Sequence, residues 1–372
     1  MRPAVEPSSP APLLDWARFL AAFWVLLCHA RPEHWVAWTA LDPESRGWPA
    51  RLFFLLIRPG PEAVVVFFVL SGFLVGGRLV SNARSGRFSV GVYAIDRVSR
   101  IFLPLVPALA VTAGCETMRL GGWPADPGYV WLGNLVQLQG VAVPVLSANS
   151  PLWSLAYEVW FYVLGGALAW GWTRRTAAPW GPRVLALGLA LLALGCLVRL
   201  ELVYFVCWLA GAWAGARVRA PLSRPRLGAA AMAAVLGVAL RQATGEDQGP
   251  LVAASRPLFL VGTLVLGGAV AVLLPALASI RLSSGFIARL GARLAAFSFT
   301  LYLTHAPILL LLRECHAPHA AFTGISLLEF LAKILVCLVA AWGLALLVER
   351  PTPRVRAWLR DRLLSSSPPT AR

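Results

Sequence analysis

The first residues that could do chemistry are a cation and an imidazole inside one apolar run. The stretch ARFLAAFWVLLCHA, residues 17–30, contains Arg18 and His29 eleven positions apart. Eleven helical residues make three turns plus about 20°, so both side chains share one face, roughly 16 Å apart. Asp15 can pair with Arg18 one turn away. We expect His29 to act as a base and Arg18 to line the site; the alternatives are a headgroup contact for Arg18 and a helix-to-helix hydrogen bond for His29.

A carboxylic acid occupies a second apolar run. In SPLWSLAYEVWFYV, residues 150–163, Ser154, Glu158 and Tyr162 fall at i, i+4 and i+8 on one helix face. A carboxylate at this depth needs a partner, and Glu158 could orient or charge-balance the imidazole of His29. The sequence therefore predicts a catalytic role for Glu158 and places Ser154 beside it.

A third apolar run contains a second intramembrane histidine. In FSFTLYLTHAP, residues 297–307, Ser298, Tyr302 and His305 occupy a single helix face. Pro307 follows and can kink the helix. His305 either lines the site together with Tyr302 or satisfies a backbone carbonyl that the proline leaves free. Both interpretations stay open from the sequence.

Two arginines precede another span. DRVSRIFLP, residues 96–104, contains Arg97 and Arg100, which point the same way and could grip the phosphate groups of a cofactor. The alternative is that they anchor the helix end at the membrane surface.

A small-residue pattern occupies FFVLSGFLVGG, residues 67–77. Gly72 and Gly76 have the spacing that favours close helix packing in membranes. Ser71, beside them, is a weaker candidate for lining the site.

These residues need membrane helices to position them. The chain has 372 residues, of which 58% are hydrophobic and only 13% charged, and its mean hydropathy is +0.70. Such values indicate an all-α, polytopic membrane protein with about ten transmembrane helices. We expect these helices at residues 13–30, 62–80, 98–115, 152–172, 183–199, 202–217, 227–241, 257–279, 294–313 and 328–349.

The net charge of +16 raises the question of nucleic-acid binding, which the charge distribution answers. With the N-terminus in the cytoplasm, 22 of the 33 basic residues fall in cytoplasmic segments and nine in outer segments. This asymmetry follows the positive-inside rule for ten helices with both termini cytoplasmic. We therefore expect the lipid bilayer, and no nucleic acid, as the partner of this basic chain.

The rest of the chain predicts a single membrane domain. We expect a disordered tail at residues 1–12, the transmembrane domain at 13–352 and a basic cytoplasmic tail at 353–372. The six cysteines lack metal-type spacing, so neither a disulfide framework nor a zinc site follows, and we expect no metal.

Taken in order, the motifs resemble the acyltransferase 3 family of bacterial membrane O-acyltransferases. The resemblance rests on LLDWARFLAAFWVLLCHA, AVVVFFVLSGFLVG, RVSR, LWSLAYEVWFYVL, FSFTLYLTHAPI and VERP, and covers about residues 13–352. It implies a ten-helix core in the bacterial inner membrane and an acyl-CoA donor, acetyl-CoA being the simplest. It also implies a carbohydrate or glycolipid acceptor in the cell envelope. Val65 stands where many members have an acidic residue.

Carried over by position, the resemblance makes His29, Arg18 and Glu158 catalytic and makes Arg97 and Arg100 the donor-side arginines. The nucleotide end of acyl-CoA would then bind these arginines, while His29 deprotonates an acceptor hydroxyl. Direct transfer and a transient acyl-imidazole both fit. The alternative function is a non-catalytic transporter or flippase of glycan or acyl intermediates.

Overall fold

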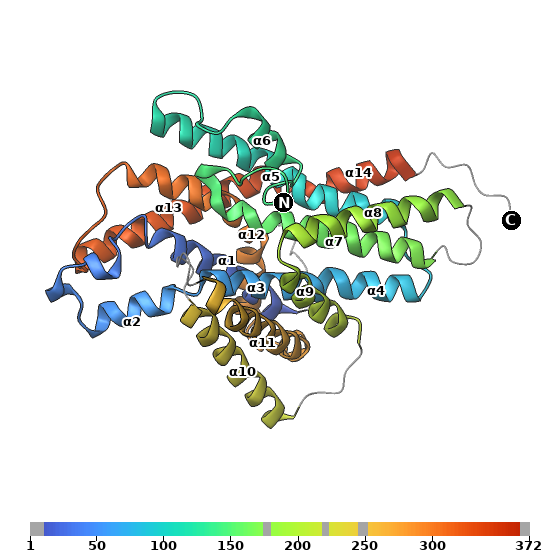
Figure 1. The fold of residues 1–372 in the computed structure, drawn as a ribbon, viewed down its shortest axis with the longest axis horizontal. Coiled ribbons are helices and arrows are strands. Elements are labelled where there is room, and N and C mark those ends of the chain that lie inside the picture. Colours follow the sequence, from blue (N-terminus) through green and yellow to red (C-terminus); the bar gives the residue numbers. More distant parts are fainter. Residues whose placement is uncertain (1–10, 174–179, 218–222, 245–251, 365–372) are drawn as a thin grey trace. The chain divides into compact units, whose positions relative to one another are not determined.

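The structure, a computed structural model, describes residues 11–173, 180–217, 223–244 and 252–364. These residues fold almost entirely as helices, and their only β pairings are two isolated bridges. Figure 1 shows the helices: α1 Pro12–Ala30, α2 Trp48–Ile57, α3 Gly60–Ser71, α4 Gly77–Arg84, α5 Val90–Leu120, α6 Gly128–Leu135, α7 Trp153–Thr173, α8 Trp180–Arg199, α9 Leu202–Gly215, α10 Arg224–Thr244, α11 Val252–Ser279, α12 Gly285–Arg313, α13 Gly324–Val348 and α14 Thr352–Leu364.

The predicted all-α membrane fold is confirmed. Within the described ranges nine helical segments are long and apolar enough to cross a bilayer. The span predicted at residues 202–217 corresponds to α9, which has only 14 residues and is shorter than a typical crossing. The second predicted span belongs to a longer segment, Trp48–Arg84, which comprises α2, α3, a π-helical turn and α4.

The chain forms two compact units. Unit 1 consists of residues 1–29, 47–77 and 206–299, and unit 2 of residues 30–46, 78–205 and 300–372. Helices α9 and α12 each begin in one unit and end in the other. The residues predicted to do chemistry are divided between the two: Asp15, Arg18, His29 and Ser71 lie in unit 1, and the others lie in unit 2.

In unit 1, α11 packs along α10 and against α3. The π-helical turn Gly72–Gly76 follows α3 and packs against α9. A Cβ atom at Gly72 would overlap the backbone carbonyl of Trp208, and one at Gly76 would overlap the side chain of Ala212. The predicted packing role of both glycines is confirmed, because only glycine allows the two backbones to approach this closely.

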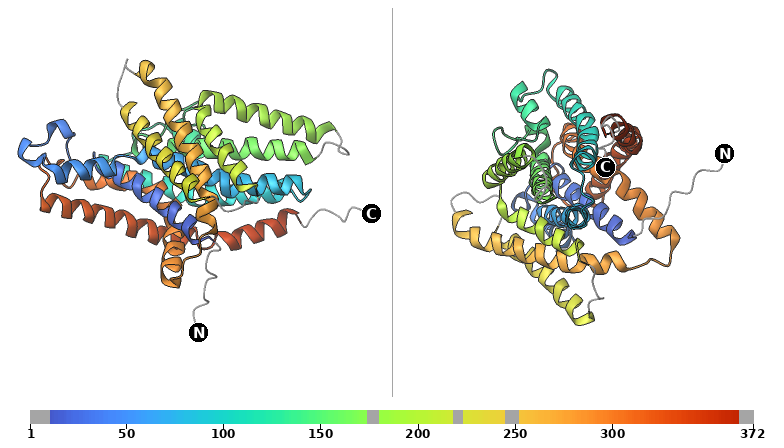
Figure 2. Two further views of the ribbon diagram at one scale, coloured as in Figure 1. Left: turned by 90° about the horizontal axis from the view of Figure 1, so that it is seen from below. Right: turned by 90° about the vertical axis from the view of Figure 1, so that its right-hand side faces the viewer.

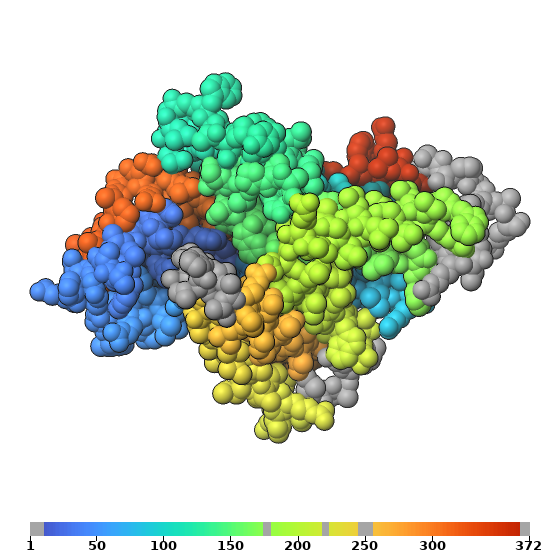
Figure 3. Space-filling model, in the orientation of Figure 1, coloured from blue at the N-terminus to red at the C-terminus, as the bar shows by residue number. Residues whose placement is uncertain are grey.

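In unit 2, the buried helix α7 packs against α8, whose outer surface is apolar and exposed. It pairs with α8 over much of its length, and the two green helices run side by side in both views of Figure 2. Most of α7 is buried, whereas α8 exposes several leucines and valines. Figure 3 shows α8, in yellow-green, on the surface of the face in view. An exposed apolar helix surface is what contact with lipid requires. Helix α5 packs against α7, α13 and α14.

The predicted tails have different outcomes. Residues 1–10 lie outside the described part of the chain, and α1 already begins at Pro12. The basic cytoplasmic tail predicted at residues 353–372 is helical in its first part, because residues 352–364 form α14, which packs against α5. Asp96 of α5 forms ion pairs with Arg356 at 3.5 Å and with Arg360 at 2.6 Å. These two arginines lie one turn apart, so a single acidic partner can dock the helix.

Candidate functional site

Helix α1 carries three residues predicted to take part in the chemistry, Asp15, Arg18 and His29. It runs uninterrupted from Pro12 to Ala30, which confirms the helix that the spacing of Arg18 and His29 assumed. Arg18 Nη1 lies 3.4 Å from Asp15 Oδ1, the predicted pair one turn apart. Near the other end of the helix, Cys28 Sγ donates to the carbonyl oxygen of Arg58 at 3.3 Å. This contact fixes the turn that carries His29, whose side chain is partly exposed.

Ser71 lies in a packed region of unit 1. The indole Nε1 of Trp208 donates a hydrogen bond to Ser71 Oγ at 3.3 Å. Ser71 stands at the last residue of α3, directly before the π-helical turn. Ser71 therefore contacts α9, the helix that packs against Gly72 and Gly76. Its role in lining the site stays a prediction.

Arg97 in unit 2 lies against aromatic rings. Its guanidinium carbon is 5.3 Å from the centre of the Tyr162 ring and 6.0 Å from that of Tyr93. Tyr93 OH donates to the backbone carbonyl of Tyr162 at 3.1 Å, which joins α5 to α7 at this point. Within the described residues, Arg97 Nε is buried and has no hydrogen-bond partner. A guanidinium held by rings alone keeps its donors for a ligand.

Arg100 has different surroundings from Arg97. Its Nη1 forms an ion pair of 2.7 Å with Oε2 of Glu349, the acidic residue of VERP. The other carboxylate oxygen of Glu349 accepts from the backbone N–H of Thr300 at 3.1 Å and from its hydroxyl at 2.6 Å. Arg100 thus joins α5 to the end of α13 and to α12. The structure therefore gives the two predicted donor arginines different contacts.

Glu158 and Arg97 are connected through a shared tyrosine. Tyr162 OH donates to Glu158 Oε1 at 2.5 Å, one turn along α7, and the ring of the same tyrosine lies under Arg97. The predicted shared face of Glu158 and Tyr162 is confirmed. Within unit 2, Tyr162 therefore contacts both a predicted acid and a predicted donor arginine.

Ser154 and Tyr302 form a second polar contact in unit 2. Their hydroxyl oxygens are 2.6 Å apart, and Tyr302 OH lies 2.8 Å from the carbonyl oxygen of Pro151. Because a carbonyl can only accept, Tyr302 donates to Pro151 and Ser154 donates to Tyr302. The two candidate residues are thus brought together, from α7 and α12.

His305 is fully buried, and its described contact is with a carbonyl oxygen of the preceding turn. Its Nδ1 lies 3.0 Å from the carbonyl oxygen of Leu301. Pro307 has no N–H for the carbonyl of Leu303 four residues earlier. Asn149 Nδ2 donates to that oxygen instead, at 2.9 Å. Asn149 therefore supplies a donor to the carbonyl that the proline leaves free, and both sequence interpretations of His305 stay predictions.

The sequence reasoning missed a buried ion pair in unit 1. Arg241 Nε lies 3.1 Å from Glu62 Oε1, and only 2% and 5% of the two side chains are exposed. Gln242 Nε2 donates to the other Glu62 oxygen at 2.8 Å, and Arg241 also donates to the Thr263 hydroxyl. Glu62 lies one turn before Val65, where the resemblance led us to look for an acid. An acidic residue at the start of an apolar run was the available indication.

The pairing of His29 with Glu158 stays a prediction, because the two residues belong to different units. The same holds for a polar passage that would connect Arg18 with Arg97. Within each unit, the described contacts join Asp15 to Arg18 and Ser154 to Tyr302, and they connect Glu158 to Arg97 through Tyr162.

These features define a multi-pass membrane protein with ionisable side chains inside its helical core. Residues 12–346 match the acyltransferase 3 family model, described as an acyltransferase domain. The match covers nearly the whole chain, so the protein belongs to this family and is a membrane acyltransferase. Neither a curated protein nor a solved structure gives a significant match to the chain.

Proposed function

We propose that the protein is an O-acyltransferase of the bacterial inner membrane. It takes an acyl group, acetyl in the simplest case, from acyl-CoA on the cytoplasmic side. It transfers this group to a hydroxyl of a carbohydrate or glycolipid on or across the membrane. The family supports the acyl transfer itself, and the basic residues concentrated on one side of the spans support a cytoplasmic donor.

The assignment of the acyl-CoA site rests on the contacts of the Arg97 guanidinium. Its guanidinium stacks over two tyrosine rings, and its buried Nε has no partner among the described residues. A cation held in this way has donors left for an anion such as a phosphate of CoA. Arg100 already binds Glu349, so in this proposal Arg97 is the main donor contact and Arg100 shapes the site around it.

The reaction needs a base for the acceptor hydroxyl. In the proposal, His29 removes the hydroxyl proton as the acceptor oxygen attacks the thioester carbonyl carbon. The new C–O bond forms, the C–S bond breaks, and the proton passes to the CoA thiolate. Alternatively, the imidazole attacks first and the acceptor then takes the acyl group from it. A radiolabelled acyl group trapped on the protein without acceptor would select the second route.

The direct test uses the purified chain in detergent with acetyl-CoA. Release of free CoA thiol should depend on an added glycan acceptor, and mass spectrometry should show the acceptor heavier by one acyl group. His29→Ala should abolish both signals. Unchanged transfer by His29→Ala would remove the imidazole from the chemistry, and acyl-CoA that is never consumed would contradict the proposed donor.

A matched pair of arginine variants tests the donor contact. Arg97→Ala should raise the KM for acyl-CoA by roughly 10- to 100-fold, since a lost hydrogen bond to a charged group costs about 1.5–3 kcal/mol. Arg84→Ala, at an exposed arginine ending α4, is the control and should leave the KM unchanged. Equal effects of the two variants would show that only general positive charge matters.

A further inference from the structure

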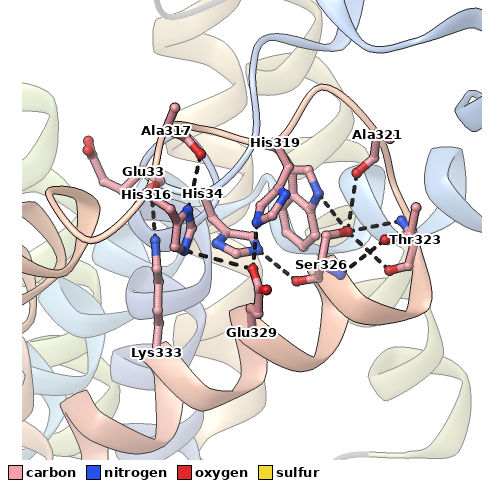
Figure 4. A network of polar contacts seen from close by, with 11 residues as sticks. Glu33, His34, His316, Ala317, His319, Ala321, Thr323, Ser326, Glu329 and Lys333 are labelled. Atoms are coloured by element: carbon pink, nitrogen blue, oxygen red, sulfur yellow. Dashed lines mark hydrogen bonds and ion pairs between the residues drawn. The ribbon is translucent and has the colours of Figure 1, made fainter.

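Three histidines that the sequence analysis did not select converge in unit 2 (Figure 4). His34 follows α1 in a non-helical segment, and His316 and His319 lie in the loop between α12 and α13. One ligand atom from each of the three rings lies within 4.8 Å of the others. His34 is fully buried, while His316 and His319 are partly exposed.

Each imidazole has one nitrogen held by an acceptor of the protein. His34 Nε2 lies 2.7 Å from the carbonyl oxygen of Ser326, and His316 Nδ1 lies 3.1 Å from that of Ala317. His319 Nε2 lies 2.6 Å from Glu329 Oε2. Carbonyl and carboxylate oxygens accept, so these three nitrogens carry the protons. The opposite nitrogen of each ring therefore keeps its lone pair.

The lone pair of His34 is the most informative of the three. Its Nδ1 is buried and has no hydrogen-bond partner in the part of the chain that the structure describes. A buried acceptor without a donor is costly unless a ligand occupies it.

We propose that His34, His316 and His319 bind one zinc ion. Three imidazoles whose other nitrogens donate to carbonyl or carboxylate oxygens are the usual surroundings of zinc in proteins. Zinc bound at about 2.0–2.1 Å in tetrahedral geometry needs nitrogen atoms roughly 3.3 Å apart. The partly exposed rings of His316 and His319 can close this gap by side-chain rotation. Water completes the coordination, and Glu329 orients His319.

The surrounding charges agree with a cation at this position. The carboxylate of Glu329 is 2.6 Å from His319 and 3.9 Å from His316, so it faces the cluster directly. Lys333 is the opposing charge, and its Nζ donates to the backbone oxygen of Glu33 at 3.4 Å. Figure 4 shows this lysine at the edge of the cluster, beside His316.

The zinc would join two segments that already contact each other. The N–H of Val36 donates to the carbonyl oxygen of His319 at 3.1 Å, and the N–H of His319 donates to that of His34 at 2.9 Å. A capping box between Thr323 and Ser326 begins α13 directly beside them, and Ser326 supplies the carbonyl that orients His34. The ion therefore stabilises the junction of the segment after α1 with the loop before α13.

The test measures zinc binding by the full chain, purified in detergent without a histidine tag and stripped with a chelator. Competition with a chromophoric chelator should give one zinc per chain. His316→Ala/His319→Ala should weaken zinc binding by at least roughly 100-fold, and Glu329→Gln by about 10- to 100-fold. Cys315→Ser removes a thiol from the same loop and is the control; it should bind zinc as the unmodified chain does. The cobalt form should show the intense visible absorption of tetrahedral coordination.

The histidine variants change a partly exposed loop, so their folding can be checked by gel filtration and thermal unfolding. A folded double variant that binds zinc as tightly as the unmodified chain would overturn the proposal. Loss of binding in Cys315→Ser would also overturn it, because the thiol would then be the ligand. A cobalt spectrum typical of six oxygen ligands would exclude the three imidazoles.

Discussion

The buried ion pair of unit 1 permits a quantitative test of the helical core. Glu62 and Arg241 come from α3 and α10, and their side chains are almost completely buried. Glu62→Gln leaves the guanidinium without its counter-charge, and Arg241→Met leaves the carboxylate without one. Removing one partner of a buried pair costs about 3–5 kcal/mol, because the remaining charge stays out of water.

The double variant should cost much less than the sum of the single variants. Glu62→Gln/Arg241→Met has no buried charge, and such neutral replacements are often close to neutral in stability. A single-variant cost of about 3 kcal/mol corresponds to a change of roughly 100-fold in the unfolding equilibrium constant. We therefore expect a favourable coupling free energy between Glu62 and Arg241, similar in size to the cost of one single variant.

The assay is reversible unfolding of the purified chain in mixed micelles with increasing denaturing detergent, followed by tryptophan fluorescence. All four proteins of the double-mutant cycle are compared in the same micelles. If the effects of Glu62→Gln and Arg241→Met simply add in the double variant, the two charges do not stabilise each other, and the reasoning from their burial is refuted.

Three further perturbations follow from described contacts. Gly72→Ala should destabilise unit 1 by about 1–3 kcal/mol because its Cβ would meet the carbonyl of Trp208, whereas Gly114→Ala, where a Cβ meets open space, should be neutral or stabilising in the same unfolding assay. Asn149→Asp removes the donor that Thr112 and Leu303 both use, so it should cost at least about 2 kcal/mol; a melting temperature equal to that of the unmodified protein would contradict this account. Asp96→Asn should cost less than about 1 kcal/mol, because its ion pairs with α14 are partly exposed; faster proteolysis near residue 352 would report detachment of α14, and a large loss of global stability would show that the helix contributes more than these contacts suggest.

The sequence predicted the helices well because hydrophobic length is a local property. The length of the apolar run around Arg18 and His29 predicts one helix, and α1 is that helix. Gly72 and Gly76 were correctly interpreted because their spacing has a direct packing consequence. Helix α14 was missed because its basic composition resembles a soluble tail, and its partner Asp96 is far away in the sequence.

The site was harder to predict because its contacts join distant residues. Periodicity indicated which side chains share a face, such as Glu158 and Tyr162, but not that Tyr162 also lies under Arg97. The difference between the contacts of Arg97 and those of Arg100 depends on Glu349, some 250 residues later. The three histidines escaped notice because His34 lies in an irregular segment, where no helical period applies. The spacing of His316 and His319 was the only available indication.

The carboxylate of Glu349 connects three helices. Its two oxygens accept from three donors, one on α5 and two on α12, and Glu349 itself caps α13. One carboxylate thus holds three helices at one point. For the proposed transfer, we therefore expect residues remote from VERP, rather than this fixed point, to set the length of acyl chain that the protein accepts.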